Sequence, residues 1–295
     1  MTAPAANAGV LYVVATPIGN LEDLSPLARR VLGEVQAIVC EDTRHSRKLL
    51  EAEGIEKPLI SFYEENEAQR LPELLARLRA GESLALISDA GAPAVADPGY
   101  RLTAAAAAEH LRIVPVPGAS AVMAGLMASG LPSDAFYFGG FLPARSGARR
   151  ARLRELAERS ETLIFFEAPH RLRASLDDIK DILGGQRCMA AARELTKLYE
   201  EIVRGTVTEV SQKFSQQEPR GELTLVIAGA GKEPEAGENT EAGSLRARAV
   251  VEMRVRLAQG LGPREALRET ARALGIKRSE LYRWWEQEKE TGKRD

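Results

Sequence analysis

The feature that most constrains the fold is the alternation of short apolar runs with amphipathic segments in the first half of the chain. Runs rich in β-branched and apolar residues cover residues 10–15, 37–40, 59–62, 84–88 and 112–116. Segments of helical periodicity separate them, as in "NEAQRLPELLARLRAG". This alternation predicts a mostly parallel sheet flanked by helices. In "LSPLARRVLGEV", Ser25 as the N-cap and Pro26 in the first turn predict where the first helix begins.

The second half of the chain continues the pattern of strands and helices. The segments "AFYFGGFLP", "TLIFFEAP", "RCMAAAREL" and "GELTLVIAG" each indicate a strand. A later segment, "GAGKEPEAGENTEAG", is rich in Gly and Glu without apolar periodicity, which is typical of a linker. We therefore expect an N-terminal α/β domain over residues 1–122, a second α/β domain over 123–230, a linker over 231–243 and a helical domain over 244–295.

The C-terminal segment "REALRETARALGIKRSELYRWWEQE" has the spacing of a helix-turn-helix. The small Ala271 lets two helices approach closely, and Gly275 can take the left-handed backbone conformation that the turn demands. A helical hairpin used for packing or dimerisation has the same pattern, so both interpretations stay open. Basic residues on or beside the second helix favour contact with nucleic acid. They are Lys277, Arg278 and Arg283.

The positive charge is concentrated in two stretches, although the net charge is only −2. Residues 244–295 hold 13 Lys and Arg against 8 Asp and Glu. A second run, "PARSGARRARLRELAER", holds six arginines against two glutamates. Either stretch alone is as consistent with a solvated helix face. Two of them in one chain favour a polyanionic partner.

Cysteine usage and hydropathy bear on the compartment. Cys40 and Cys188 lie far apart without a CxxC partner, and no basic-then-apolar leader stands at the N-terminus. We therefore expect a cytoplasmic protein without disulfides. Because no apolar stretch approaches the ~20 residues that a membrane-spanning helix needs, we expect no membrane partner.

Glycine, proline and acidic residues gather in the loops that follow the predicted strands. These loops are "TPIGNLEDL", "EDTRHS", "SDAGAPAVADPG", "PGASA", "FEAPHR" and "ARELTK". Ligands of open α/β sheets bind beyond the carboxyl ends of the strands. No loop matches GxGxxG or the P-loop, so dinucleotide and triphosphate binding lack their usual signature. Asp89 can accept hydrogen bonds from a hydroxyl or amino group, although each loop alone is also consistent with a simple turn.

Taken together and in order, these motifs are far more specific than their parts. "LYVVATPIGNLEDLSPLARRVL", "EDTRHSRKLL", "LISDAGAPAVADPG", "VPVPGASA", "FFEAPHRL", "RELTKLYEE" and "GELTLVIAG" resemble the ribosomal RNA small subunit methyltransferase I family of the tetrapyrrole methylase superfamily. The resemblance covers roughly residues 10–230, and the C-terminal segment resembles the small domain of many members. One departure is Ala92, which stands where Thr is common.

The resemblance implies a fold, a cofactor and a reaction. The fold would be two α/β domains with the cofactor cleft between them, plus a small helix-turn-helix-like domain, in a homodimer. The reaction would be transfer of a methyl group from S-adenosylmethionine to the ribose 2′-oxygen of a decoding-centre cytidine in 16S ribosomal RNA, on the assembled small subunit. The implied cofactor contacts are Asp89, Ala90, Gly91, Ser120, Ala121, Phe166, Glu167, Ala168, Glu194, Leu195 and Thr224.

The chemistry of this reaction suggests which residues face the acceptor. Displacement at a sulfonium needs no metal, and positioning can supply much of the catalysis. A ribose hydroxyl is a poor nucleophile, so a base or a polarising hydrogen bond should help. We expect Asp42, Arg44 and Lys197 as the catalytic residues, and Glu167 beside either the cofactor or the hydroxyl. Asp42 has an alternative role, because an acid at this position can cap the helix that begins near Thr43.

The same resemblance makes 16S ribosomal RNA in the small subunit the expected partner, bound through the basic stretches. The expected RNA contacts are Arg145, Arg149, Arg150, Arg152, Lys277, Arg278 and Arg283. Sequence-specific readers of RNA stack splayed bases on aromatic side chains, yet only 5% of this chain is aromatic. We therefore expect specificity to come from the shape of the ribosomal particle.

Two alternatives stay open. A methyltransferase of the same superfamily that acts on a tetrapyrrole or a protein side chain would share the loops but have no use for the basic stretches. A DNA-binding regulator that senses a ligand would need its C-terminal segment alone to bind duplex DNA. An enzyme would instead lose its activity when the loops at the strand ends change.

Overall fold

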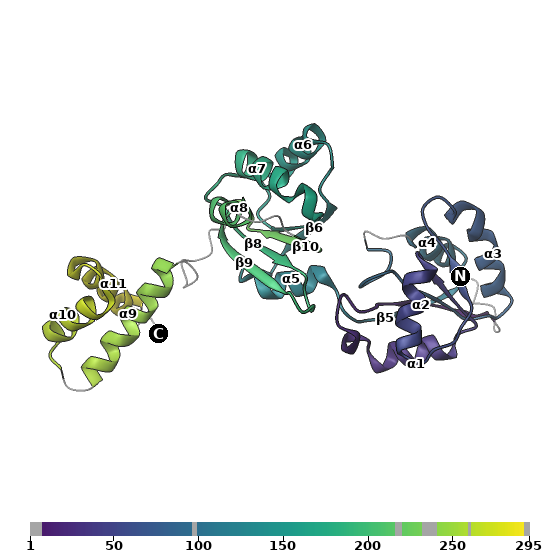
Figure 1. Ribbon diagram of the computed structural model, residues 1–295, viewed down its shortest axis with the longest axis horizontal. Coiled ribbons are helices and arrows are strands. Elements are labelled where there is room, and N and C mark those ends of the chain that lie inside the picture. The colour runs from purple at the N-terminus through teal and green to yellow at the C-terminus, as the bar shows by residue number, and fades with distance from the viewer. Residues whose placement is uncertain (1–7, 96–98, 216–219, 232–240, 259–260, 292–295) are drawn as a thin grey trace.

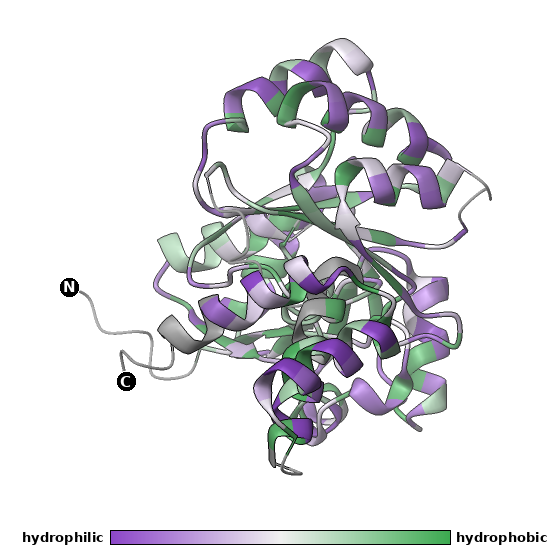
Figure 2. Ribbon diagram, turned by 90° about the vertical axis from the view of Figure 1, so that its left-hand side faces the viewer, coloured by the Kyte–Doolittle hydropathy of each residue, from purple (hydrophilic) through white to green (hydrophobic). Residues whose placement is uncertain are grey.

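The chain forms two sheets, each with its own helices, followed by a group of C-terminal helices (Figure 1). The computed structural model describes residues 8–95, 99–215, 220–231, 241–258 and 261–291. In Figure 2 the strands between the helices are largely hydrophobic, whereas the helices carry most of the hydrophilic positions. No described helix is long and apolar enough to cross a lipid bilayer.

The first sheet is five-stranded and parallel, with the order β3-β2-β4-β1-β5, as the alternation predicted. Its strands are β1 (Val10–Val14), β2 (Ala37–Cys40), β3 (Leu59–Ser61), β4 (Leu84–Leu86) and β5 (Arg112–Val116). The helices between them are η1 (Leu21–Asp23), α1 (Pro26–Glu34), α2 (Thr43–Ala52), α3 (Glu67–Arg79) and α4 (Tyr100–Ala108). The predicted start of α1 is confirmed, because the Ser25 hydroxyl accepts a hydrogen bond from Ala28 N at 3.1 Å.

Both faces of the first sheet are buried, which is the usual state of a parallel sheet. In β2, Ile38 and Cys40 belong to one apolar cluster with α1 and α2. Ala37 and Val39 belong to a second cluster on the opposite face, with α3 and α4. The strands are thus fixed from both sides, and the loops at their carboxyl ends start from rigid supports.

The second sheet is mixed, with the order β6-β7-β10-β8-β9. Its strands are β6 (Phe136–Phe141), β7 (Thr162–Glu167), β8 (Cys188–Arg193), β9 (Glu201–Thr206) and β10 (Leu223–Ile227). Only β6 and β7 run parallel, whereas β10 is antiparallel to β7 and β8, and β9 is antiparallel to β8. The pattern of the sequence predicted four of these strands. It missed β9, an edge strand that carries Arg204 and Gly205 and has no fully buried residue.

Helices cover the second sheet on both faces (Figure 1). They are α5 (Ala121–Ser129), α6 (Ser146–Leu156), η2 (Pro169–Arg171), α7 (Leu172–Leu183) and α8 (Val207–Ser215). Helices α6, α7 and α8 form one apolar cluster with the sheet, and α5 packs on the other face through Val122 and Leu126. The chain crosses from the first sheet to the second just before α5, so the residues of the crossing lie between the two sheets.

The C-terminal helices are α9 (Glu241–Ala258), α10 (Pro263–Leu274) and α11 (Arg278–Thr291). Gly275 ends α10 with φ of 65°, the left-handed conformation predicted for the turn, and its N–H bonds to the carbonyl of Ala271. Ala271, Leu281 and Trp284 share one apolar cluster, so the predicted helix-turn-helix packing is present. Residues 232–240 of the expected linker lie outside the described residues, and α9 starts at Glu241 rather than at residue 244.

Candidate functional site

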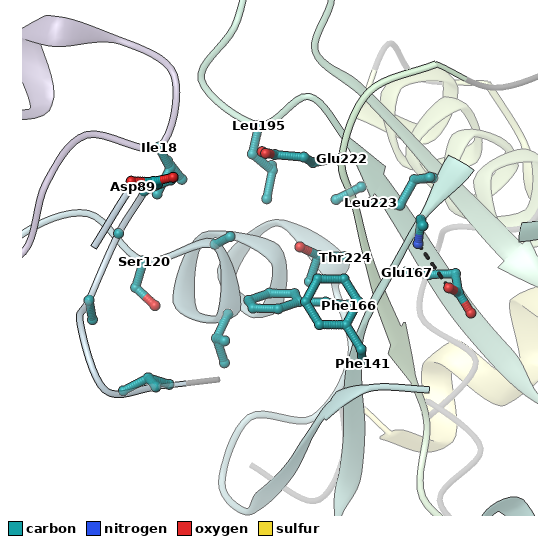
Figure 3. A pocket seen from close by; sticks show the side chains of 18 of the residues that line it. Ile18, Asp89, Ser120, Phe141, Phe166, Glu167, Leu195, Glu222, Leu223 and Thr224 are labelled. Carbon is teal, nitrogen blue, oxygen red and sulfur yellow. Dashed lines mark hydrogen bonds between the residues drawn. The ribbon is translucent and has the colours of Figure 1, made fainter. Parts of the chain in front are cut away.

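A cavity of about 400 Å³ opens between the two sheets, and both of them line it (Figure 3). From the first sheet come the loops after β1 and β4, and from the second come α5 and the ends of β6, β7, β8 and β10. The predicted cofactor residues that line it are Asp89, Ala90, Gly91, Ser120, Ala121, Phe166, Glu167, Ala168, Leu195 and Thr224. Glu194 is not among the lining residues.

The loop after β4 is held against the loop after β1. Thr16 and Gly91 exchange two backbone hydrogen bonds, of 2.8 and 3.1 Å between N and O. The Thr16 hydroxyl also donates to the Ser88 carbonyl at 3.1 Å. Gly91 has φ of +78°, and a Cβ there would lie 3.2 Å from Cγ2 of Ile18, another lining residue. The backbone therefore comes to the cavity wall at a point where a side chain would crowd it.

The far wall depends on the packing of α5 against β10. Ser120 is the N-cap of α5 and accepts a long hydrogen bond of 3.5 Å from Met123 N. Gly125 lies so close to the sheet that a Cβ there would be 2.8 Å from Cγ2 of Thr224. This close approach holds the middle of α5 against the buried Thr224, and Thr224 and the start of α5 both contribute to the lining.

Glu167 contributes to the lining at the end of β7, but its carboxylate is bound within the protein. It accepts hydrogen bonds from the Ser175 hydroxyl and, at 2.8 Å, from Ala168 N. Arg171 pairs with it at 2.7 Å, and the Glu167 side chain is fully buried. These contacts fix the turn from β7 into η2.

A charged cluster lies beside the cavity, where the loop after β8 meets the start of β10. Glu194 and Thr196 have positive φ angles of 53° and 65°, which non-glycine residues rarely adopt. The Lys197 Nζ lies 3.0 Å from Oε1 of Glu194 and 3.0 Å from Oε2 of Glu222. Burial lowers the pKa of Lys197, but hydrogen bonds to the two carboxylates outweigh it and raise that pKa overall. Lys197 is therefore a cation near neutral pH, and of this cluster only Glu222 lines the cavity.

Asp42 and Arg44 lie next to the cavity without lining it. Asp42 is the N-cap of α2 and accepts from Arg44 N at 2.8 Å, so the alternative capping role is present. Its hydrogen bonds with Arg44 lower its pKa to about 2. The Asp42 N–H in turn donates to Oδ1 of Asp89 at 3.3 Å, which connects the cap to the cavity wall. Next to them, burial and then the charges of Asp89 and Asp42 raise the pKa of Glu41.

Arg149, one of the expected RNA contacts, has a side chain that is only 4% exposed. It forms an ion pair with Asp178 at 2.6 Å and donates to the carbonyls of Pro143, Ala144 and Ala174. The sequence alone does not indicate which arginine of a basic run faces inward.

The other predicted RNA residues are at least partly exposed. Arg150 pairs with Asp178 and Asp181, and Arg152 pairs with Glu155. The exposed members of the set are Arg145, Lys277, Arg278 and Arg283.

Sequence reasoning did not single out several lining residues. They are Ile18, Val95, Val122, Phe141, Pro169, Ala192, Glu222 and Leu223. Most stand beside a residue that was predicted, so the motif loops carried the signal. Phe141 is different, because it belongs to the edge strand β6 and comes to the cavity through the fold.

The two-sheet architecture is shared with known methylases. The model of the family Tetrapyrrole (Corrin/Porphyrin) Methylases matches residues 10–211. The solved structure of the methyltransferase CobJ has a TM-score of 0.58 at 19% identity, and covers 76% of this chain and 95% of its own. Diphthine synthase has a TM-score of 0.57 at 12% identity, with coverage of 75% and 90%. These identities are low, so the two structures establish the shared fold alone.

Much closer relatives are named "Ribosomal RNA small subunit methyltransferase I". The one from Pseudomonas aeruginosa is 46% identical over 280 residues, which covers 94% of this chain and 96% of the relative. The one from Synechocystis is 44% identical, with coverage of 93% and 96%. The chain therefore belongs to the tetrapyrrole methylase family and, within it, to the ribosomal RNA small subunit methyltransferase I family. It is a methyltransferase whose methyl donor is S-adenosylmethionine, as the resemblance implied.

The residues of the cavity fit this donor. Asp89 offers a carboxylate for the amino or hydroxyl groups of the donor, and the backbone at Gly91 approaches without a side chain. Much of the remaining wall is apolar, with Ile18, Phe166 and Leu195 among its members. A few polar groups in a mostly apolar concave site are typical of cofactor pockets.

Proposed function

We propose that the chain methylates the ribose 2′-oxygen of a decoding-centre cytidine in 16S ribosomal RNA, acting on the assembled small ribosomal subunit. The observation that carries this proposal is the 46% identity over 94% of the chain to a relative named for the small subunit ribosomal RNA. The structural neighbours named for porphyrin or diphthine chemistry share no more than 21% identity, so they favour no other acceptor.

For the donor, we propose contacts with nine of the eleven residues that the resemblance implied, and a supporting role for Glu167 and Glu194. When bound, S-adenosylmethionine supplies a methyl group on a positively charged sulfur. Asp89 would anchor polar groups of the donor, and the close backbone approach at Gly91 would admit it. Glu167 would act through its buried contacts, by holding the turn that places Phe166 and Ala168. Glu194 would act in the same indirect way, since its carboxylate accepts the N–H of Glu222 at 3.0 Å.

On the acceptor side, we propose roles that suit the protonation states of Lys197 and Asp42. Because its pKa is raised, Lys197 serves as a cation that orients the acceptor rather than as a base. Asp42 has a pKa of about 2 and is a weak base, so with Arg44 it serves to position the loop that bears Asp89.

RNA binding would use exposed cations on two parts of the chain. We propose Arg145 as the main contact of the run around α6, with Arg150 and Arg152 available if they exchange their carboxylate partners for phosphates. Lys277, Arg278 and Arg283 would contact RNA from the C-terminal helices. We also propose the homodimer that the resemblance implied. A cytoplasmic location belongs to the same proposal, because ribosomal subunits are found in that compartment.

The test is transfer of labelled methyl from S-adenosylmethionine to small subunits purified from cells that lack this protein. We expect label in one nucleotide, recovered as 2′-O-methylcytidine after digestion to nucleosides. Protein-free 16S RNA serves as the comparison, and we expect it to be a much poorer acceptor. Label on a base, or no label on subunits despite binding of the donor, would overturn the proposal. Equal labelling of free RNA would remove the part that requires the assembled particle.

A further inference from the structure

Strand β6 contains a bulge that redirects one aromatic side chain. In its pairing with β7, Phe138 lies opposite Ile164 and Phe141 lies opposite Phe166. Three steps along β6 thus correspond to two along β7, and Gly140, which lies between the two phenylalanines, takes φ of +64°. Side chains alternate between the faces of a strand, so in a regular strand Phe141, three residues after Phe138, would point to the opposite face. The bulge brings both rings to the face on which α5 and the cavity lie.

Phe141 joins an aromatic group at the mouth of the cavity. Its ring centroid is 5.5 Å from that of Phe166, at an interplanar angle of 63°. Phe138 packs on Phe166 in the same edge-to-face manner, with the centroids 5.0 Å apart. Figure 3 shows the rings of Phe141 and Phe166 beside each other in the cavity. Phe166 is thus held from two sides, and Phe141 is the outer member of the group.

Phe141 is also 55% exposed, which leaves much of its ring facing solvent at a ligand site. Four residues further along the chain is Arg145, an exposed cation at the N-cap of α6. An exposed aromatic face followed by a cation is the combination that binds an unstacked nucleobase and the neighbouring phosphate. The proposed donor residues include Phe166, on which Phe141 packs, its strand partner Thr224, and the loop of Asp89 from the first sheet.

We propose that Phe141 is a stacking platform for an unpaired nucleobase of the RNA acceptor at the mouth of the cavity. This inference rests on the proposed function. From the low aromatic content we expected specificity to come from the shape of the ribosomal particle. A stacked base at Phe141 would add a direct contact with the RNA. The ring holds the base against the edge of the second sheet, and Arg145 binds the phosphate beside it. The ribose of that nucleotide is thereby brought to the cavity.

The test compares three variants, assayed on small subunits from cells that lack the protein. Phe141→Leu removes the flat ring, Phe141→Tyr keeps it, and Phe136→Leu is the matched control. Phe136 lies on the same strand at 41% exposure and is not among the lining residues. Steady-state rates at saturating donor give kcat/KM for subunits, and calorimetry with S-adenosylhomocysteine gives the affinity of the donor pocket.

We expect Phe141→Leu to lower kcat/KM for subunits about tenfold or more, the usual loss when one stacked base is released. Phe141→Tyr and Phe136→Leu should stay within about twofold of the wild type, and all variants should bind S-adenosylhomocysteine equally. If Phe141→Leu weakens the binding of S-adenosylhomocysteine as much as it lowers kcat/KM, the ring of Phe141 contacts the donor and the inference is overturned. Unchanged methylation by Phe141→Leu also overturns it. If the wild type itself transfers no methyl to subunits, the proposed function fails and the inference fails with it.

Discussion

Asp42 and Arg149 are charged residues whose structural contacts did not follow from their place in the sequence. Asp42 stands in a motif loop, where both an acceptor-side role and a capping role were open, and it caps α2. Arg149 stands in a basic run but is buried on Asp178. Residue type and loop position were readable from the sequence. Whether a charged side chain faces a neighbour or the solvent was not, because it depends on partners 29 residues away in the case of Arg149.

The Asp42 cap should make stability depend on pH in the acid range. Its ordinary pKa of 3.8 falls to about 2 in the folded chain, because hydrogen bonds from Arg44 favour the carboxylate. A depressed folded pKa stabilises the fold above the ordinary value, and this contribution is lost as the pH falls through about 2. An NMR titration of the Asp42 carboxyl should therefore show a midpoint near that value.

Variants of Asp42 separate the cap from the charge. Asp42→Asn keeps a capping acceptor, so we expect thermal unfolding near that of the wild type at neutral pH. Asp42→Ala removes the acceptor and should lower the Tm. Equal Tm values for the two variants, or a carboxyl midpoint near 4, would contradict the capping role.

At the scale of elements, α6 presents two faces with different tasks. Arg149 is buried between α6 and α7, whereas Arg145 at the start of the helix is exposed. The sequence indicated the helix and its charge but not its orientation on the sheet. Strand β9 and the bulge of β6 were also not predicted. Both depend on pairing with distant strands, and the glycines of "FGGF" hide the alternation that would reveal the face of Phe141.

The two faces of α6 predict opposite results for two arginine variants. Arg149→Ala breaks a buried ion pair, so we expect the free energy of unfolding in urea to fall by about 3 kcal/mol. Arg145→Ala should change it by less than about 0.5 kcal/mol, because the side chain is exposed. Affinity for small subunits, measured at several salt concentrations, should instead depend on Arg145. Arg145→Ala should reduce the slope of log K against log salt concentration by about one phosphate contact. A destabilised Arg145→Ala, or a salt slope that it leaves unchanged, would contradict this division.

At the scale of the whole molecule, the cavity arises where two sheets of different build meet. The parallel order of the first sheet followed from the alternation of strands and helices. The mixed order of the second sheet did not, because β10 joins β7 and β8 from a distant part of the chain. The motif loops indicated most of the cavity wall through the family resemblance. The contribution of Glu222 and Phe141 became visible only in the folded chain.

A calorimetric titration of S-adenosylhomocysteine shows whether the methyl donor binds in this cavity. Gly91→Ala is the informative variant and Gly54→Ala is its matched control. Both glycines have similar positive φ angles, +78° and +66°, so either substitution strains the backbone by about 1 to 2 kcal/mol. Only at Gly91 does the new Cβ meet a neighbour, Ile18 of the cavity wall, whereas Gly54 has open space around it.

We predict that the wild type and Gly54→Ala bind S-adenosylhomocysteine with the same Kd, and that Gly91→Ala binds it about tenfold more weakly, a loss of about 1.4 kcal/mol. Equal affinity of all three proteins, or weakening in Gly54→Ala alone, would contradict the placement of the donor between the two sheets.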